Sequence, residues 1–293
     1  MRRLAGVFMC RWVSMATILP LTSFFHHEAA MGASTEETPS VAGGILLTES
    51  REFDKAVRVF DMVLSEDPKN AVAHTYKGFS LIYVREYRRA LDALNKATEI
   101  NPDLMLAWLG KDQALSILGD NAKSRECRER VLNSDPKDAL GFLARANARQ
   151  SDGQHDRAIE DLGKAIALDA KLTEAYSQRG ALYRNKSEYD RAMKDLDTAI
   201  ELNPRHVGAL TSRANTWRYK GNIEKAIEDH TKAIAVNPGF AVAYFNRGRA
   251  HFEKEDYSHA RLDWEKVLEI EPEDSRVRAA ATQNLQVLKH MGK

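Results

Sequence analysis

The sequence predicts an all-α protein, built as a solenoid of stacked antiparallel helix pairs. Six prolines share one 34-residue spacing, small and apolar residues recur with the same period, and an amphipathic segment follows the last period. A fixed period of this length is typical of stacked supersecondary units. The prolines are Pro68, Pro102, Pro136, Pro204, Pro238 and Pro272, with Ala170 at the missing position.

The composition is that of an ordinary globular protein. The 293 residues include 43 Lys and Arg and 42 Asp and Glu, a net charge of +1, and 43% are hydrophobic. This hydrophobic content argues against a disordered chain and against a polytopic membrane protein. The near-neutral charge argues against a basic nucleic-acid-binding surface, so no nucleic-acid partner is expected. The two cysteines, Cys10 and Cys127, exclude a disulfide framework and an all-cysteine zinc site.

Residues 1–33 differ from the rest of the chain. Three arginines precede an apolar run of 14 residues from Trp12 to Phe25, and small residues follow this run. A membrane-spanning helix needs about 20 apolar residues, whereas this run has the length of the apolar core of a signal peptide. We expect a cleaved export signal and a periplasmic or extracellular protein. An uncleaved anchor, which would be the only contact with a membrane, and a mitochondrial targeting sequence remain alternatives.

Residues 37–274 divide into seven units of 34 residues, and a position within a unit is called a column. Columns 4, 8 and 11 follow helical spacing on a first helix, and columns 20, 24 and 27 do so on a second. Column 8 is Gly or Ala in six units and column 20 is Ala in six, so the two helices are expected to approach closely. The proline of column 32 is expected to end the second helix, because the residue before a proline avoids the α conformation.

These columns resemble the tetratricopeptide repeat. Unit 241–274, AVAYFNRGRAHFEKEDYSHARLDWEKVLEIEPED, matches the aromatic–Gly–Ala–aromatic–Pro pattern of that family nearly throughout. The resemblance implies a right-handed superhelical solenoid whose first helices line a concave groove. We expect irregular stacking between the third and fourth units, which depart most from the pattern. The departures in units one, three and four are Ser40, Asp112, Arg128, Arg149 and Ala170.

Residues 275–293 are predicted to form a C-terminal capping helix, over 275–290, and a short tail. Val277, Ala281, Leu285 and Leu288 make one apolar stripe, and polar residues face away from it. A helix of this kind covers the open end of a solenoid and keeps the array soluble.

Two columns of opposite charge run through the last four units. Column 7 is Arg and column 23 is Asp in each unit, which predicts one Arg–Asp pair between the two helices of each unit. We interpret these pairs as an ion-pair ladder that sets the register of the stack; the alternative is that the arginines are presented to a ligand. The residues are Arg145, Arg179, Arg213 and Arg247, with Asp161, Asp195, Asp229 and Asp263.

The family resemblance assigns columns 2, 5, 6, 9, 12 and 13 to the concave groove. These columns are apolar and aromatic in the N-terminal half and polar and basic in the C-terminal half. Such a groove suits a protein segment with an apolar part and an acidic part or free carboxylate. Alternatively, the aromatic residues pack against neighbouring repeats and the arginines are solvated. The predicted groove residues are Tyr76, Phe79, Tyr83, Leu109, Leu143, Arg184, Asn215, Arg218, Asn246, Arg249 and Arg276.

Some members of the family hold the C-terminus of a chaperone in a carboxylate clamp. Asn215, Asn246 and Arg276 match three positions of that clamp, whereas Thr211 and Ala280 replace two charged donors. A complete clamp is therefore not expected, and a weaker amide-rich site in the last two units remains open.

No enzyme activity is predicted. The sequence has no phosphate-binding Gly-rich loop, no HExxH and no Gly-x-Ser-x-Gly, so no catalytic residue, cofactor or metal is expected. His230 and His251 fall in packing columns and are interpreted as buried polar residues with partners, because no third metal ligand is evident. Cys127 is interpreted as a small packing residue.

Two functions remain open from the sequence. The first is an exported, non-catalytic scaffold whose groove binds a protein or peptide partner in a cell envelope. The second is an adaptor or co-chaperone inside a cell or organelle that assembles a multiprotein complex. The N-terminus of the mature protein separates them, because a start near Ser34 supports export.

Overall fold

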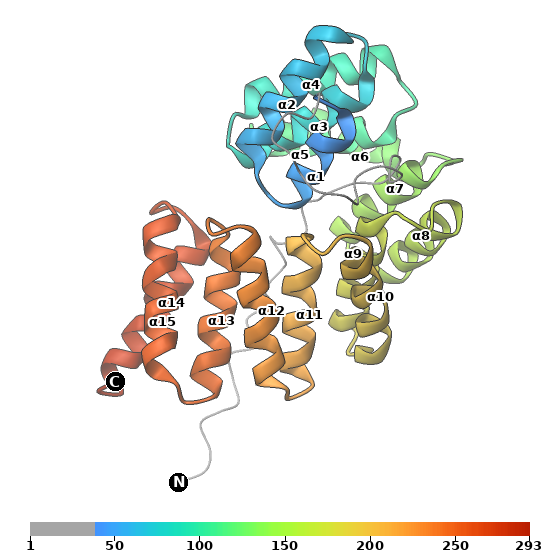
Figure 1. The fold of residues 1–293 in the computed structure, drawn as a ribbon. Helices are drawn as coiled ribbons and strands as arrows, with labels where there is room; N and C mark the ends of the chain where they lie inside the picture. The colour runs from blue at the N-terminus through green and yellow to red at the C-terminus, as the bar shows by residue number, and fades with distance from the viewer. Residues whose placement is uncertain (1–38) are drawn as a thin grey trace.

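The computed structural model describes residues 39–293, and the export signal expected at residues 1–33 lies outside this range. The secondary structure within 39–293 is α-helical throughout (Figure 1). The helices are α1 (Val41–Glu49), α2 (Phe53–Glu66), α3 (Ala71–Tyr83), α4 (Tyr87–Ile100), α5 (Met105–Ile117), α6 (Asn121–Leu132), α7 (Ala139–Ser151), α8 (His155–Leu168), α9 (Thr173–Asn185), α10 (Tyr189–Leu202), α11 (Val207–Tyr219), α12 (Ile223–Val236), α13 (Ala241–Glu253), α14 (Tyr257–Ile270) and α15 (Arg276–His290).

The helices form seven pairs, one to each 34-residue unit, and we number these pairs repeats 1 to 7. Each repeat has an odd-numbered first helix and an even-numbered second helix joined by a short turn, so the two run antiparallel (Figure 1). Each pair contacts the next, and α15 packs against repeat 7. The predicted all-α solenoid of helix pairs with a C-terminal helix is confirmed.

Column 8 lets the two helices of a repeat approach closely. A Cβ atom added at Gly78 would lie 2.5 Å from Cγ of Leu94, and one added at Gly180 would lie 2.7 Å from Cγ of Leu196. Both leucines occupy column 24 of the second helix and are fully buried. A side chain in place of either glycine would therefore push the helices apart, since a close-packed interior has no space for it.

Repeat 3 has an ion pair in the two packing columns, where repeats 2 and 5 have glycine and leucine. Asp112 stands in column 8 and Arg128 in column 24, and Nε of Arg128 donates to Oδ2 of Asp112 at 2.9 Å. Ser124 donates to the other carboxylate oxygen at 2.6 Å. The second helix of this repeat, α6, ends in column 28, whereas the other second helices end in column 30. Repeat 3 thus departs from the pattern within its own helix pair, and irregular stacking of repeats 3 and 4 stays a prediction.

A second helix can end without the proline of column 32. Repeat 4 has Ala170 in the proline column, yet α8 ends at Leu168, in the same column as its counterparts. The carboxylate of Asp169 accepts from the backbone N–H of Lys171 at 2.9 Å, and Asn101 accepts in the same way from Asp103 at 3.0 Å. The Asp or Asn side chain thus forms the turn, and proline is not required for it.

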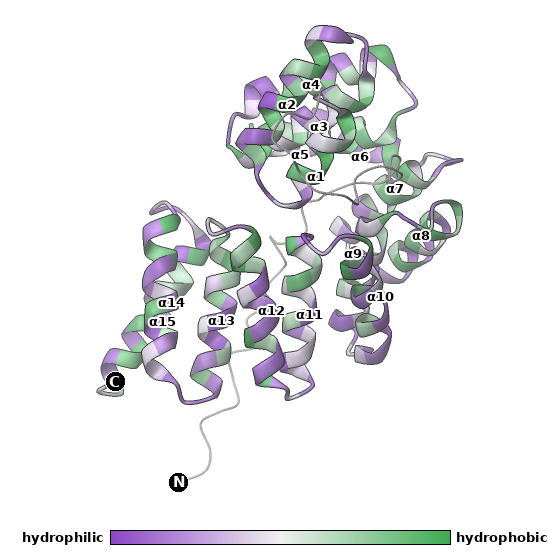
Figure 2. Ribbon diagram, in the orientation of Figure 1, coloured by the Kyte–Doolittle hydropathy of each residue, from purple (hydrophilic) through white to green (hydrophobic). Residues whose placement is uncertain are grey.

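Buried apolar residues run along the whole stack, and each helix carries both hydrophobic and hydrophilic residues (Figure 2). One contiguous cluster extends from Ile45 in α1 to Leu182 in α9. A separate cluster with Trp264 and Leu288 joins repeat 7 to α15. The predicted apolar stripe of α15 takes part in this cluster and covers the end of the core.

The stack turns far enough for repeat 1 to reach the C-terminal repeats (Figure 1). Asn203, in the loop between α10 and α11, donates to the carboxylate of Glu49. Asn237, in the loop between α12 and α13, donates to the backbone oxygen of Arg51 at 3.1 Å. The turn between α1 and α2 therefore lies against the loops that join repeats 5, 6 and 7, and it partly closes the inner side of the solenoid.

Candidate functional site

All four predicted Arg–Asp pairs are present. In each pair Nε and Nη2 of the arginine donate to the two carboxylate oxygens at 2.7–3.0 Å. The aspartates are buried and the arginines are half-buried. The pairs are Arg145–Asp161, Arg179–Asp195, Arg213–Asp229 and Arg247–Asp263.

The ladder arginines also reach the preceding repeat. Nη1 of Arg145 donates to the backbone oxygen of Ser134 at 2.7 Å, and Nη1 of Arg213 donates to Asp197 at 2.8 Å. The hydrogen bonds of Arg213 to its carboxylate partners raise the pKa of its guanidinium. Because these donors are used within the stack, the geometry supports a ladder that sets the register over arginines presented to a ligand.

The apolar half of the predicted groove is interior and not surface. Tyr76, Phe79, Leu109 and Leu143 are at most 2% exposed and belong to the contiguous core, so their assignment to an open groove is wrong. The ring of Tyr76 stacks on Phe60 of α2 at 6.1 Å between centroids. The first helices α1, α3, α5 and α7 also contact one another directly, which leaves no open surface at these side chains.

Tyr83 is held by the turn between α1 and α2. Its ring stacks on Phe53 with centroids 4.1 Å apart and planes 2° apart. The guanidinium of Arg51 lies 5.5 Å from the Tyr83 centroid and 4.6 Å from that of Phe240, which precedes α13. Burial raises the pKa of Tyr83 to about 12. Arg51 thus links Tyr83 of repeat 2 to Phe240, at the junction between repeats 6 and 7.

The polar half of the predicted groove contains a cluster of half-buried arginines on α9, α11 and α13. We call Arg184, Arg218 and Arg249 the arginine face. Burial lowers the pKa of Arg184 and of Arg249, and the charge of Arg218 lowers both further. Arg218 pairs with Glu253 at 2.5 Å, whereas Arg249 has no hydrogen bond or ion pair within 39–293. Three guanidiniums beside one carboxylate repel one another, and an anion would relieve that repulsion.

The other predicted groove residues lie near this face. Asn215 on α11 and Asn246 on α13 are half-buried, and Arg276 is exposed at the start of α15. None of the three forms a hydrogen bond within 39–293. Thr211 is buried and donates to the backbone oxygen of Val207 at 2.8 Å, so it adds no donor for a ligand.

A small pocket of about 160 Å³ adjoins the arginine face, between repeat 7 and α15. The rings of Phe252 and Trp264 lie 5.8 Å apart in its wall, and Arg249 and Glu253 supply charge. The sequence did not reveal this pocket, because the stripe of α15 indicated only a covered core. Its lining residues are Arg249, Phe252, Glu253, Trp264, Asn284 and Val287.

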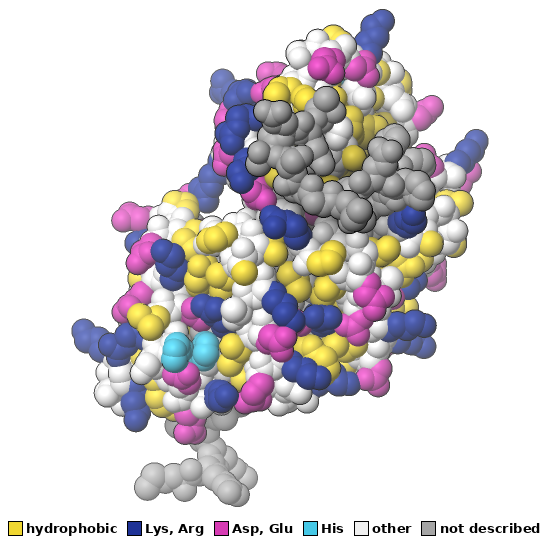
Figure 3. All heavy atoms as spheres, in the orientation of Figure 1, with side chains coloured by type: hydrophobic (Ala, Val, Ile, Leu, Met, Phe, Trp, Pro, Cys, Tyr) yellow, Lys and Arg dark blue, Asp and Glu magenta, His cyan; other side chains and the backbone are white. Residues whose placement is uncertain are grey.

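Basic and hydrophobic side chains lie close together over the C-terminal repeats on the face shown in Figure 3. No helix within 39–293 is both long enough and apolar enough to span a bilayer.

A buried polar cluster lies between repeat 1 and repeats 5 and 6. Glu174 accepts from Nε2 of Gln178 at 2.7 Å and from Nε2 of His206 at 2.9 Å. Nδ1 of His206 accepts from the backbone N–H of Ala209 at 3.0 Å and so caps α11. This cap places the proton of the neutral imidazole on Nε2, facing Glu174.

Glu49 is the carboxyl group that repeat 1 brings into this cluster. It is fully buried; Oε2 accepts from Asn203, and Oε1 has no hydrogen-bond partner in the described part of the chain. Burial raises the pKa of Glu49 from 4.5 to about 7, against the opposing effect of His206. Sequence spacing could not indicate this contact, because Glu49 and Asn203 are 154 positions apart.

The histidines differ from expectation. His230 is fully buried, and neither ring nitrogen has a hydrogen-bond partner among the described residues, so the expected partner is wrong. Burial and neighbouring arginines lower the pKa of His230 to about 3. His251 is half-buried with Asp256 3.3 Å from its Nδ1, as expected of a polar residue with a partner, although this nitrogen has no hydrogen bond among the described residues. Together with His259 these two residues form a cluster that the sequence analysis missed. Cys127 is buried, as expected of a packing residue.

Two segments of the chain match the tetratricopeptide repeat family, residues 173–206 and residues 241–274. They coincide with repeats 5 and 7 of the structure. Together with the stacked helix pairs they show that the chain is a tetratricopeptide repeat protein. No curated protein matches the sequence.

Solved structures share the fold. The human IFIT1 dimer with PPP-AAAA is 21% identical, with a TM-score of 0.65, and the match covers 85% of this chain and 64% of that one. The APC/C hetero-tetramer Cut9–Hcn1 is 18% identical, with a TM-score of 0.59, and the match covers 82% of this chain and 46% of that one. The chain spans roughly half to two thirds of these proteins. At such identities the likeness concerns the fold alone.

Proposed function

We propose that the protein is a non-catalytic protein-interaction scaffold that binds an acidic segment of a partner on the arginine face of repeats 5–7. The observation that carries this proposal is the position of Arg184, Arg218 and Arg249 on three consecutive first helices. Their mutual repulsion is only partly balanced by Glu253, and Arg249 has no hydrogen bond or ion pair within 39–293.

The chemistry of the face defines the ligand. A guanidinium binds a carboxylate through two parallel hydrogen bonds, which favours Glu, Asp or a C-terminal carboxylate. The half-buried position weakens screening by salt, so each contact is stronger than at a flat surface. The adjoining pocket, with Phe252 and Trp264 in its wall, has the size and lining for one apolar side chain. The proposed ligand is therefore an acidic segment with an apolar residue beside its carboxylates.

Residues 1–33 are the basis for the proposed compartment. We propose that they are a cleaved export signal and that the scaffold acts in a cell envelope, with an intracellular or organellar adaptor as the alternative. N-terminal sequencing of the protein isolated from its source decides between them. A mature start near Ser34 supports export, whereas retention of Met1 contradicts a cleaved export signal.

Binding is tested with a labelled peptide that ends in Glu-Glu-Phe with a free carboxylate. Fluorescence anisotropy compares the wild-type chain with the triple variant Arg184→Gln, Arg218→Gln, Arg249→Gln. We expect the triple variant to bind at least about tenfold more weakly, because three charge-assisted contacts are lost.

A matched control removes the same charge elsewhere. Arg58, Arg88 and Arg125 are exposed and have no hydrogen bond or ion pair within 39–293. Their replacement by Gln should leave peptide binding unchanged. Equal weakening in both triple variants, or equal binding of an amidated peptide with Gln for Glu, contradicts the arginine face as the site.

A further inference from the structure

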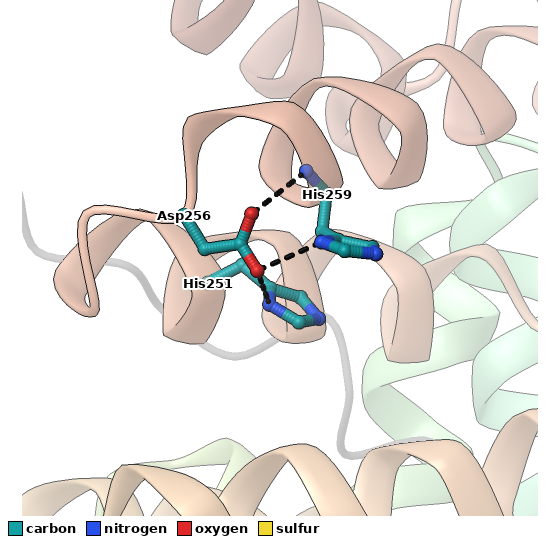
Figure 4. A group of neighbouring side chains, drawn as sticks. All are labelled: His251, Asp256 and His259. Atoms are coloured by element: carbon teal, nitrogen blue, oxygen red, sulfur yellow. Dashed lines mark hydrogen bonds and ion pairs between the residues drawn. The ribbon is translucent and has the colours of Figure 1, made fainter.

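Three possible metal ligands meet at the turn between α13 and α14 (Figure 4). His251 lies in the last turn of α13, Asp256 is the N-cap of α14, and His259 is in the first turn of α14. Oδ2 of Asp256 lies 3.3 Å from Nδ1 of His251 and 2.7 Å from Nδ1 of His259. The two imidazole rings stack with centroids 5.1 Å apart.

These separations are close to those of a metal centre. Zinc binds histidine nitrogen at about 2.0–2.1 Å and carboxylate oxygen at about 2.0–2.2 Å, so tetrahedral ligand atoms lie about 3.4 Å apart. The His251–Asp256 distance already has this value within about 0.1 Å. The His259–Asp256 distance must lengthen by about 0.7 Å, which the exposed side chain of His259 allows by rotation.

The backbone holds the three ligands in place. The N–H of Asp256 donates to the carbonyl of His251 at 2.9 Å, and Glu255 takes a positive φ of 62° to make the turn. Oδ1 of Asp256 accepts from the N–H of His259 at 3.3 Å, which leaves Oδ2 directed at the two rings. The carboxylate is thus oriented by its role as a helix cap, as supporting hydrogen bonds orient the ligands of known metal sites.

The surroundings suit a cation with an open coordination position. The side chains of His251, Asp256 and His259 are 14%, 34% and 64% exposed, so one side of the cluster is protein and the other is solvent. Arg247, four residues before His251 on α13, is paired with Asp263. Its charge is therefore balanced within the ladder.

We propose that His251, Asp256 and His259 form a zinc site in repeat 7. Nδ1 of each histidine and Oδ2 of Asp256 bind one Zn²⁺, and water occupies the remaining position on the solvent side. Two imidazoles and one carboxylate favour zinc and related transition metals over magnesium or calcium, which prefer oxygen ligands alone. The ion fixes the turn between α13 and α14 and stabilises repeat 7, which carries one end of the arginine face.

The proposal is tested by zinc titration of the untagged full chain in competition with a chromophoric chelator. The variants are His259→Ala, which removes an exposed ligand, and Asp256→Asn, which removes the charge and keeps a side chain able to cap the helix. Asn222 caps α12 in this way, with its side chain accepting from Lys225 at 3.1 Å. The control is His155→Ala, an exposed histidine at the start of α8.

The test depends on the difference in zinc affinity between the variants, because Cys10, His26 and His27 are also possible zinc ligands in the full chain. We expect the wild-type and His155→Ala chains to bind one equivalent of zinc at this site. The variants His259→Ala and Asp256→Asn should bind that equivalent at least about 100-fold more weakly. Zinc should raise the melting temperature of the first pair and not of the second. In the first pair, Co²⁺ in place of zinc should give the visible absorption of a four- or five-coordinate centre.

The opposite results overturn the site. If all four chains bind zinc equally, the ion lies elsewhere in the protein. If none of them binds zinc in competition with the chelator, Asp256 is only a hydrogen-bond partner of His259 and a charged neighbour of His251. Circular dichroism of each variant confirms the folded state before titration. The peptide test of the arginine face is made without zinc, so failure of one proposal leaves the other standing.

Discussion

Repeats 1 and 2 and repeats 4–7 hold their helix pairs together by different means. In repeats 1 and 2 a glycine of the first helix lies against a large apolar residue of the second, as Gly44 does against Phe60. Repeats 4–7 keep a small residue in that column and add the Arg–Asp pair beside it. Repeat 3 lies between these types, because its ion pair occupies the packing columns themselves.

The inner faces of the N-terminal and C-terminal repeats also differ in polarity. The first helices of repeats 1–4 bury their inward aromatic and aliphatic residues, whereas those of repeats 5–7 carry half-buried arginines and amides. The ion pairs run through repeats 4–7, and the inner columns are polar in repeats 5–7, where we propose that a partner binds.

The largest expected effect comes from breaking one pair of the ladder. Asp195→Ala leaves the guanidinium of Arg179 with no acidic partner in a half-buried position, which should lower the free energy of unfolding by about 3 kcal/mol. Asp229→Ala should cost less, because Arg213 keeps Asp197 at 2.8 Å. Urea denaturation of both variants measures the difference. If both variants lose the same free energy of unfolding, the contact between Arg213 and Asp197 contributes nothing to stability.

The stability of the contact between repeat 1 and repeats 5 and 6 should depend on pH, because Glu49 is buried in that contact. Its pKa is about 7 in the folded chain and 4.5 when unfolded, so the folded state holds a proton that the unfolded state releases. Stability from this group is complete below pH 4.5 and is lost as the pH rises through about 7, by on the order of 3 kcal/mol.

The variant Glu49→Gln isolates this effect from the other groups of the buried cluster. Glu174, His206 and Tyr76 face Glu49, whereas Arg51 and Tyr83 face Glu174, and all five remain in the variant. Unfolding free energies at pH 4.5 and pH 8 should fall with pH more steeply for the wild type than for Glu49→Gln. Parallel pH profiles would show that the carboxyl group titrates normally.

Repeat 3 can be converted to the pattern of its neighbours. The triple variant Asp112→Gly, Ser124→Ala, Arg128→Leu copies the arrangement of Gly78 and Leu94. We expect it to be more stable than the wild type by about 1 kcal/mol, because a buried ion pair is replaced by apolar contact. Asp112→Gly alone should be destabilising, since Arg128 keeps only Asp152 at 3.7 Å. Thermal melts of both variants check the contrast.

The smallest effect is expected at the exposed pair that joins repeat 2 to the segment before α15. Arg85 lies 3.3 Å from Asp274, and both side chains are more than half exposed. Arg85→Ala should change the free energy of unfolding by less than about 0.5 kcal/mol. A larger loss in urea denaturation would mean that this pair, and not the buried cluster around Glu49, joins the two regions.

Much of the repeat architecture and part of the candidate site could be predicted from the sequence. The ladder was visible because its partners lie 16 residues apart within one helical hairpin, where local geometry places them together. The arginine face was visible because the same columns recur in each repeat. Tyr76 and Leu143 were misassigned, because a column number gives the direction of a side chain and not how closely the next helix approaches.

The sequence by itself determined the repeat length, the helix pairs, the Arg–Asp ladder and the capping helix, since these depend on periodicity and on contacts within one repeat or between neighbours. Only the tertiary structure decided that repeat 1 meets repeats 5–7, that Glu49 is buried beside Glu174 and that a pocket forms beneath α15. A small rotation from each repeat to the next accumulates along the stack, and only the folded stack shows which distant surfaces it brings together.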